Sequence, residues 1–152
     1  MRNKAQVSLE FLFIFMIVLV YIMTIVEPAV SIGEASLEDV SRVSQTKLAA
    51  EKLANSINEL LVISGQAKKT LHILVPEKST IKCNLADASK PRIDFNASLS
   101  EKIAPPTDCP NRLCSGSLSL VSSTVSCQNA FKGKNFFEIE IVKDANGMIN
   151  VK

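Results

Sequence analysis

The sequence predicts an α+β fold, in which one long N-terminal helix, kinked along its length, packs on a small antiparallel β-sheet domain. Apolar residues at helical spacing extend over residues 6–64. Alternating and β-branched runs separated by turn residues follow in residues 65–152. The 152 residues suffice for one modest domain and one extended element.

The first part of the helix, residues 6–27, is almost entirely apolar. Between Phe11 and Val26 the only polar side chains are Tyr21 and Thr24, which is typical of a membrane-spanning helix. Glu10 lies where that helix would enter the hydrocarbon. An acidic side chain at the centre of a bilayer costs about 2.5 to 3.5 kcal/mol, so Glu10 is expected at an interface or beside a partner charge.

The residues before this run are short and basic. Arg2 and Lys4 provide the charge asymmetry that keeps an N-terminus in the cytoplasm. The small residue Ala5 precedes the apolar region, whereas an ordinary signal peptide has its small-residue cleavage site after that region. Cleavage after Ala5 would remove residues 1–5 as a leader and keep the apolar helix on the mature chain.

Residues 6–14, Gln-Val-Ser-Leu-Glu-Phe-Leu-Phe-Ile, resemble the class III signal peptide of archaeal type IV pilin-like proteins, whose motif is Gln-x-Ser-x-Glu followed by three residues and Leu. Ile14 replaces the last Leu, a volume-conserving change. The resemblance implies cleavage between Ala5 and Gln6 by a prepilin peptidase, a pilus assembly platform in the membrane, and an extracellular adhesive filament of self-associated copies. It also implies a type IV pilin-like fold.

Cleavage there would make Glu10 the fifth residue of the mature chain. The new α-amino group, with an ordinary pKa of about 8, would lie one helical turn away. Axial stagger between copies could bring Glu10 beside the N-terminus of a neighbour and neutralise two buried charges. If Gln6 cyclises, Glu10 needs a donor such as Ser8 instead. The side chains expected to pack in the filament core cover every side of the helix: Phe11, Leu12, Phe13, Ile14, Phe15 and Leu19.

Three alternatives to a major filament subunit remain open. A membrane-anchored extracellular binding domain that does not polymerise explains the apolar run and the basic flank, but gives no reason for Gln6, Ser8 or Glu10. A minor pilin would cap or initiate a filament, and an archaellum-type protein would serve motility. Both share the signal, whereas the anchored domain predicts that Glu10 is dispensable.

The helix is expected to kink near residues 28–33, because Pro28 removes a backbone hydrogen bond and Gly33 follows. Helical periodicity then resumes until Ser64, and Gly65 suits a left-handed cap. Glu38 with Arg42 and Lys47 with Glu51 are spaced for ion pairs. The polar face is predicted to hold Glu38, Arg42, Glu51, Asn55 and Glu59. The apolar stripe, broken at Thr46 and Lys47, is predicted to hold Leu37, Val40, Val43, Ala50, Leu53, Ile57 and Leu60.

The β-rich head is expected to form one sheet of four to six mostly antiparallel strands on the second half of the helix. Asn146-Gly147 predicts a tight hairpin before the last strand. Residues 100–117 form the longest irregular stretch. The predicted strands are residues 70–75, 80–85, 92–97, 117–127, 136–143 and 149–151.

All four cysteines, Cys83, Cys109, Cys114 and Cys127, lie in this head. An even count in a small domain beyond a membrane segment predicts two disulfides. Three pairings are possible; a local Cys109–Cys114 bridge would leave Cys83 with Cys127. Zinc binding and free thiols are the alternatives, and a zinc site lacks the usual close Cys pairs. We therefore expect neither a metal nor a cofactor.

Charge and motifs disfavour nucleic-acid binding and catalysis. Without Arg2 and Lys4 the chain has 15 basic and 15 acidic side chains, so it lacks the basic excess that phosphate binding needs. His72, the only histidine, lies in an apolar run and is expected to be a strand residue. No nucleophile motif is evident, and we expect no enzyme. Asn96-Ala97-Ser98 is a glycosylation sequon if the head is outside the cell.

Overall fold

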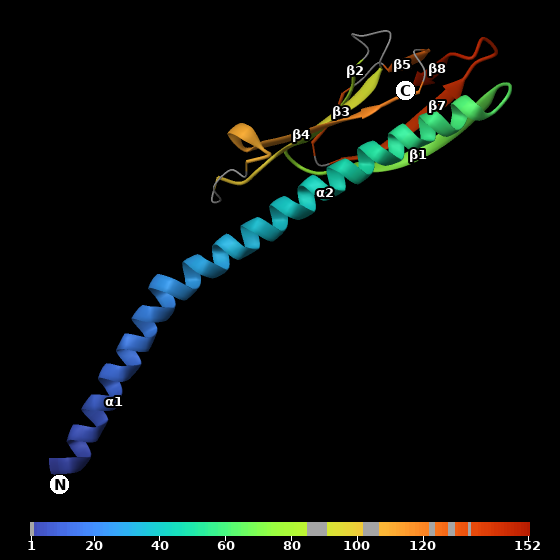
Figure 1. Ribbon diagram of the computed structural model, residues 1–152. Helices are drawn as coiled ribbons and strands as arrows, with labels where there is room; N and C mark the ends of the chain where they lie inside the picture. The colour runs from blue at the N-terminus through green and yellow to red at the C-terminus, as the bar shows by residue number, and fades with distance from the viewer. Residues whose placement is uncertain (1, 85–90, 102–106, 122–123, 128–129, 134) are drawn as a thin grey trace.

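The computed structural model describes residues 2–84, 91–101, 107–121, 124–127, 130–133 and 135–152, with side chains from Leu9 onward. One helical rod runs from the N-terminus and carries the β-rich head on its C-terminal part (Figure 1). The rod comprises α1 (Arg2–Tyr21), a π-helical turn η1 (Ile22–Val26) and α2 (Glu27–Val62). The predicted α+β fold is confirmed.

The rod bends where α1 meets α2, and Pro28 provides the cause (Figure 1). Proline has no N–H to donate and its ring crowds the carbonyl four residues back. The backbone adapts by widening the preceding turn, so that the Glu27 N–H bonds the carbonyl of Ile22. The irregular turn therefore lies at Ile22–Val26, just before the predicted 28–33 region, and Gly33 lies within regular α2.

The described residues of the head form two four-stranded sheets rather than the single sheet predicted. In the first sheet the order is β1-β7-β8-β5, antiparallel except for the parallel pair β5 and β8. The second, β4-β3-β2-β6, is antiparallel throughout. The strands are β1 (Ala67–Val75), β2 (Ser79–Asn84), β3 (Arg92–Ser98), β4 (Leu113–Ser119), β5 (Val125–Cys127), β6 (Phe131–Lys132), β7 (Asn135–Lys143) and β8 (Ile149–Val151).

Two predicted segments differ from the observed strands. The 117–127 run is divided between β4 and β5, which belong to different sheets. The stretch 100–117, predicted to be irregular, contains a short 3₁₀ turn at Pro110–Arg112 and the beginning of β4. The predicted hairpin is confirmed: Gly147 has a φ of +81°, and Asp144 Oδ1 accepts bonds from the backbone N–H groups of Asn146 and Met148.

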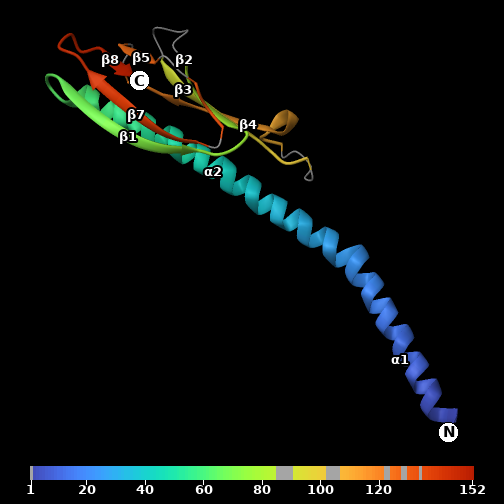
Figure 2. The same cartoon turned by 180° about the vertical axis from the view of Figure 1, so that it is seen from behind.

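The second half of α2 covers both sheets, as the two opposite views show (Figures 1 and 2). Its buried apolar residues, such as Leu53 and Ile57, meet inward-facing residues of the strands, such as Ile81 and Ile139. The predicted stripe is correct from Ala50 onward. It is wrong at its beginning, because Leu37 and Val40 are exposed, while Thr46, predicted to interrupt the stripe, is buried.

The C-terminal end of α2 is held by a side chain from the sheet. Lys143 Nζ donates to the carbonyls of Leu61, at 3.1 Å, and Ile63, at 2.6 Å. A cation there satisfies carbonyls that have no partner within the helix and complements the helix dipole. The helix ends at Val62, two residues earlier than predicted, and Gly65 adopts a left-handed φ of +96° in the turn that follows.

Candidate assembly segment and its junction with the head

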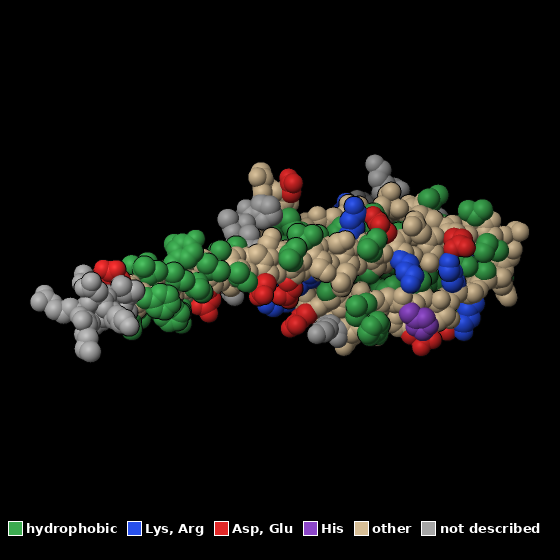
Figure 3. All heavy atoms as spheres, turned by 90° about the horizontal axis from the view of Figure 1, so that it is seen from below, with side chains coloured by type: hydrophobic (Ala, Val, Ile, Leu, Met, Phe, Trp, Pro, Cys, Tyr) green, Lys and Arg blue, Asp and Glu red, His purple; other side chains and the backbone are tan. Residues whose placement is uncertain are grey.

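The apolar segment Leu9–Val26 is a helix without any cover from the rest of the molecule. Its large hydrophobic side chains are exposed on every side, from 38% at Leu19 to 70% at Phe11. Figure 3 shows them around the thin end of the molecule, beyond the head. The helix that contains this segment is long and apolar enough to cross a membrane, and none of its most apolar 18-residue window is buried. These side chains need lipid or protein around them.

Glu10 is the one charged residue in this exposed segment. Its side chain is exposed, and no ion pair to it occurs within the described part of the chain. The backbone of Ala5, Gln6 and Ser8 belongs to α1, while their side chains lie outside the described residues. An isolated carboxylate on an apolar helix therefore fits a membrane interface or a position beside a partner charge.

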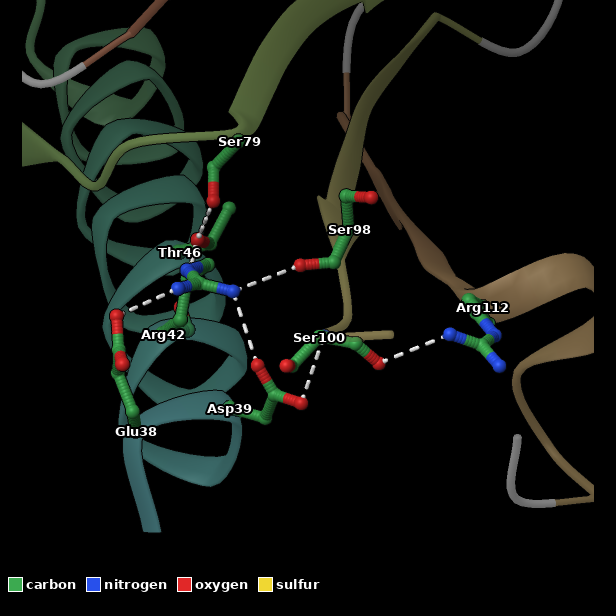
Figure 4. Close-up of polar contacts among 8 residues, drawn as sticks. All are labelled: Glu38, Asp39, Arg42, Thr46, Ser79, Ser98, Ser100 and Arg112. Carbon is green, nitrogen blue, oxygen red and sulfur yellow. Dashed lines mark hydrogen bonds and ion pairs between the residues drawn. The ribbon is translucent and has the colours of Figure 1, made fainter. Parts of the chain in front are cut away.

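A polar cluster joins the lower part of α2 to the head (Figure 4). Asp39 is 5% exposed and accepts bonds through both carboxylate oxygens, from Arg42 Nη1 at 2.9 Å and from the Ser100 N–H at 2.8 Å. Arg42 Nη1 also donates to the carbonyl of Ser98 at 2.9 Å, and Nη2 bonds Glu38 at 2.8 Å. The buried Asp39 and the largely buried Arg42 therefore connect the helix to the end of β3.

Two neighbouring contacts extend this cluster. The Thr46 hydroxyl donates to the Arg42 carbonyl at 2.7 Å and lies 2.9 Å from the Ser79 hydroxyl, at the beginning of β2 (Figure 4). Arg112 Nη1 donates to the Ser100 carbonyl at 3.4 Å. The helix is thus fixed to two strands and to the turn before β4, which sets the direction in which the free part of the rod leaves the head.

Sequence reasoning assigned Arg42 to the solvent-facing side and did not single out Asp39. The predicted Glu38–Arg42 and Lys47–Glu51 pairs are both present. However, the Arg42 side chain is only 12% exposed, because it also donates hydrogen bonds to Asp39 and to the Ser98 carbonyl of the head. The spacing of Asp39 and Arg42, three residues apart, could have indicated an ion pair on the helix. Nothing in the sequence indicated that the end of β3 would lie beside this pair.

The cysteines pair as Cys83–Cys127 and Cys109–Cys114, which is the combination that a local bridge implied. The first bridge ties β2 of one sheet to β5 of the other. The second closes the turn that contains Pro110–Arg112 and brings Cys114 to the edge of the sheet next to α2. No group of three potential ligands that could hold a metal ion occurs among the described residues.

The remaining predicted residues lie on outer surfaces of the head. Asn96 is half-buried in the middle of β3, on the polar side of its sheet, near Asp94 and Ser115. His72 is exposed on β1, where its backbone carbonyl accepts a bond from Lys52 Nζ. His72 is therefore a strand residue as predicted.

The N-terminal segment also matches a known family. Residues 3–23 match the model of the Class III signal peptide. No curated protein and no solved structure matches the chain. Such a signal implies processing by a prepilin peptidase and anchoring in a membrane, and the exposed apolar helix is long enough for such an anchor. The N-terminal segment of this chain is a Class III signal peptide, consistent with a type IV pilin-like protein.

Proposed function

We propose that this chain is a structural subunit of an extracellular type IV pilus-like filament that serves surface adhesion. The supporting observation is the combination found in α1: an apolar helix exposed on all sides that carries one carboxylate, Glu10, five residues after Ala5. A plain anchor needs the apolar surface but has no use for the charge. A helix that moves from lipid into a bundle of identical helices uses both.

The precursor is held in the cytoplasmic membrane by α1 with its head outside. Removal of residues 1–5 creates a free amino group at Gln6. The pilus assembly platform then moves the helix from lipid into the filament core, where neighbouring copies cover the aromatic side chains around Phe11 and Phe13. Glu10 of one copy pairs with the N-terminus of another, which neutralises both charges and sets the axial register. The outer surface of the head, including the side that carries Asn96 as a glycosylation site, then meets the environment.

Glu10→Ala tests this role. We expect normal leader cleavage but at least a tenfold loss of filaments, since an unpaired N-terminal charge in an apolar core costs about 3 to 5 kcal/mol. The measurement is the amount of chain in filaments sheared from cells, compared with the cleaved chain in the membrane. Glu138→Ala, which removes an exposed carboxylate from β7, serves as the control. Normal filaments from Glu10→Ala would contradict the proposed pairing.

Mass spectrometry of the sheared material separates the remaining alternatives. A dominant chain that begins at Gln6 supports a major subunit. A cleaved chain found as a trace component supports a minor pilin, and one that stays entirely in the membrane supports an anchored binding domain. Loss of swimming without loss of attachment on deletion would favour a motility filament.

A further inference from the structure

The part of α2 below the head has an apolar face that the molecule leaves uncovered. Five residues succeed one another at alternating spacings of three and four, the pattern of a coiled-coil contact line. Val30, Leu37 and Val40 in this line are 54%, 74% and 66% exposed. We call this line the α2 seam; its members are Val30, Gly33, Leu37, Val40 and Ser44.

The α2 seam is not an extension of the surface that holds the head. At about 100° per residue, Leu37 lies roughly 200° around the helix from Asp39, the first buried residue of the head-binding side. The seam instead follows the exposed apolar surface of α1 along the same rod. The head covers one side of α2 and leaves the side that carries Val30, Leu37 and Val40 exposed.

Gly33 is a residue that the isolated molecule does not need. A Cβ placed on it meets nothing within 4 Å, and its backbone is regular helix. Glycine in the interior of a helix is less stable than alanine, so neither its space nor its conformation explains the choice. Close approach of a second helix would explain a glycine at this position, because glycine lets two helix backbones come close together where they cross.

Next to the seam the head provides a wall. Val40 and Val43 form the floor of a mainly apolar hollow of about 410 Å³, and Leu99 and Cys114 of the head line its side. The Cys109–Cys114 bridge and the Asp39 contacts with Ser100 hold that wall in place. A helix lying along the seam would therefore contact the head at its flank as well as α2.

Lipid does not cover most of the α2 seam. The 18 residues from Leu9 to Val26 already extend about 27 Å, close to the roughly 30 Å of a bilayer's hydrocarbon core. Leu37 lies 11 residues further along, about 16 Å beyond that core and past the headgroup layer. The seam from Gly33 onward is therefore in an aqueous region when the precursor is anchored, and only protein can bury that part of it.

We propose that the α2 seam binds the rod of a second copy of this chain, with Gly33 at the closest approach. The inference rests on the proposed function, and it adds a contact surface beyond the α1 core and the Glu10 pairing. Continuity with α1 identifies the occupant, because a copy that covers the apolar helix and runs alongside it reaches the seam directly. The contact also secures the register outside the membrane, where the heads meet.

Charge on the flanks of the seam fixes the direction of the second helix. Glu27 and Glu34 lie on one flank and are exposed, whereas the other flank carries uncharged residues such as Ala29 and Ser36. In a parallel pair each acidic flank faces the uncharged flank of its neighbour. An antiparallel pair would place the two acidic flanks together, where like charges repel. Parallel packing is also the only arrangement open to copies inserted in one membrane.

Two seam variants test the contact in cells that produce the full chain and its assembly machinery. Gly33→Leu adds bulk at the crossing, and Leu37→Gln removes apolar surface; both should reduce sheared filaments at least tenfold. The matched control is Val121→Gln on the head, which changes an exposed apolar side chain away from the seam and should stay within twofold of wild type. Leader cleavage and both disulfides verify that each variant folds. Wild-type filament yields from both seam variants would overturn the proposal.

A second measurement separates this proposal from filament formation itself. A photocrosslinking amino acid at position 37, in intact membranes or filaments, should yield a product of twice the chain mass, and peptide mapping should find the bond on α1 or α2 of another copy. This result supports the seam even if Glu10→Ala proves harmless and the proposed filament function fails. A crosslink to lipid, to an unrelated protein or to nothing overturns it.

Discussion

The charged pair Asp39 and Arg42 holds helix α2 in place against the head, whereas most charged pairs on helices are exposed to solvent. The Asp39 carboxylate accepts one hydrogen bond from the Arg42 guanidinium on its own helix and one from the Ser100 N–H of the head, so each of its oxygens has a partner. A buried pair of this kind contributes little net stability relative to apolar packing, but it is expensive to break. Its value here lies in fixing the rotation of α2 against β3.

We expect Asp39→Ala to lower the free energy of unfolding of the head by about 3 kcal/mol, because Arg42 is then left largely buried without its closest anion. The measurement is denaturant unfolding of the full chain in detergent micelles, followed by a signal from the β-sheets. Glu38→Ala is the matched control: Glu38 also pairs with Arg42 but is 73% exposed, so its loss should cost under about 1 kcal/mol. Equal effects of the two substitutions would show that the junction is not fixed by Asp39.

Residues whose role depends on a distant strand were beyond sequence reasoning. Gly116 in β4 lies opposite Phe95 in β3, and a Cβ on Gly116 would lie 2.4 Å from Cζ of that ring. Only the pairing of the two strands reveals this close approach. Glu10, Pro28 and the i,i+4 ion pairs were predictable because their chemistry is local to the helix that carries them.

At the scale of the element, Pro28 explains why the helical rod bends between α1 and α2. The missing N–H and the widened turn before it are local consequences of one residue, and the Thr24 hydroxyl bonds the Val20 carbonyl at 2.7 Å within the same region. Such side-chain bonds to the preceding turn favour bending. The bend therefore lies between the part of the rod suited to membrane and the part that carries the head.

Pro28→Ala should restore the regular bond to the Thr24 carbonyl, straighten the rod and stabilise the helix by up to about 3 kcal/mol. Spin labels on cysteines introduced at Met16 and Leu48 would then be further apart in pulsed EPR of the full chain. Both positions are exposed, and the native cysteines are all in disulfides. Ala29→Ser, which retains the proline, should leave the distance unchanged. An unchanged distance in Pro28→Ala would mean that Pro28 does not cause the bend.

At the scale of the whole molecule, the order of elements was predictable and their assembly into sheets was not. Alternation of apolar and polar residues identified most strands. The parallel pairing of β5 with β8, and the division of the described strands into two sheets, depend on contacts between residues far apart in the sequence. The apolar stripe of α2 was read as one surface. In the structure, its first residues, Leu37 and Val40, are exposed, whereas its residues from Ala50 onward are buried against the head.

The two disulfides differ in what they hold together, and this difference predicts their contributions to stability. Cys83–Cys127 spans 44 residues and links β2 to β5, which belong to different sheets. Cys109–Cys114 spans five residues and closes one turn. In the loop-entropy account, constraint of the unfolded chain grows with loop length, to about 4 kcal/mol for the first bridge and about 2 kcal/mol for the second.

The double variant Cys83→Ser with Cys127→Ser should therefore lose about twice as much unfolding free energy as Cys109→Ser with Cys114→Ser, measured by denaturant unfolding of the full chain in micelles. Paired substitution avoids leaving a reactive thiol. The shorter bridge should matter instead for assembly, because it supports the wall of the hollow beside the α2 seam. If its removal cost more stability than removal of the long bridge, the two sheets would be held together by their shared core with α2, and the link from Cys83 to Cys127 would be secondary.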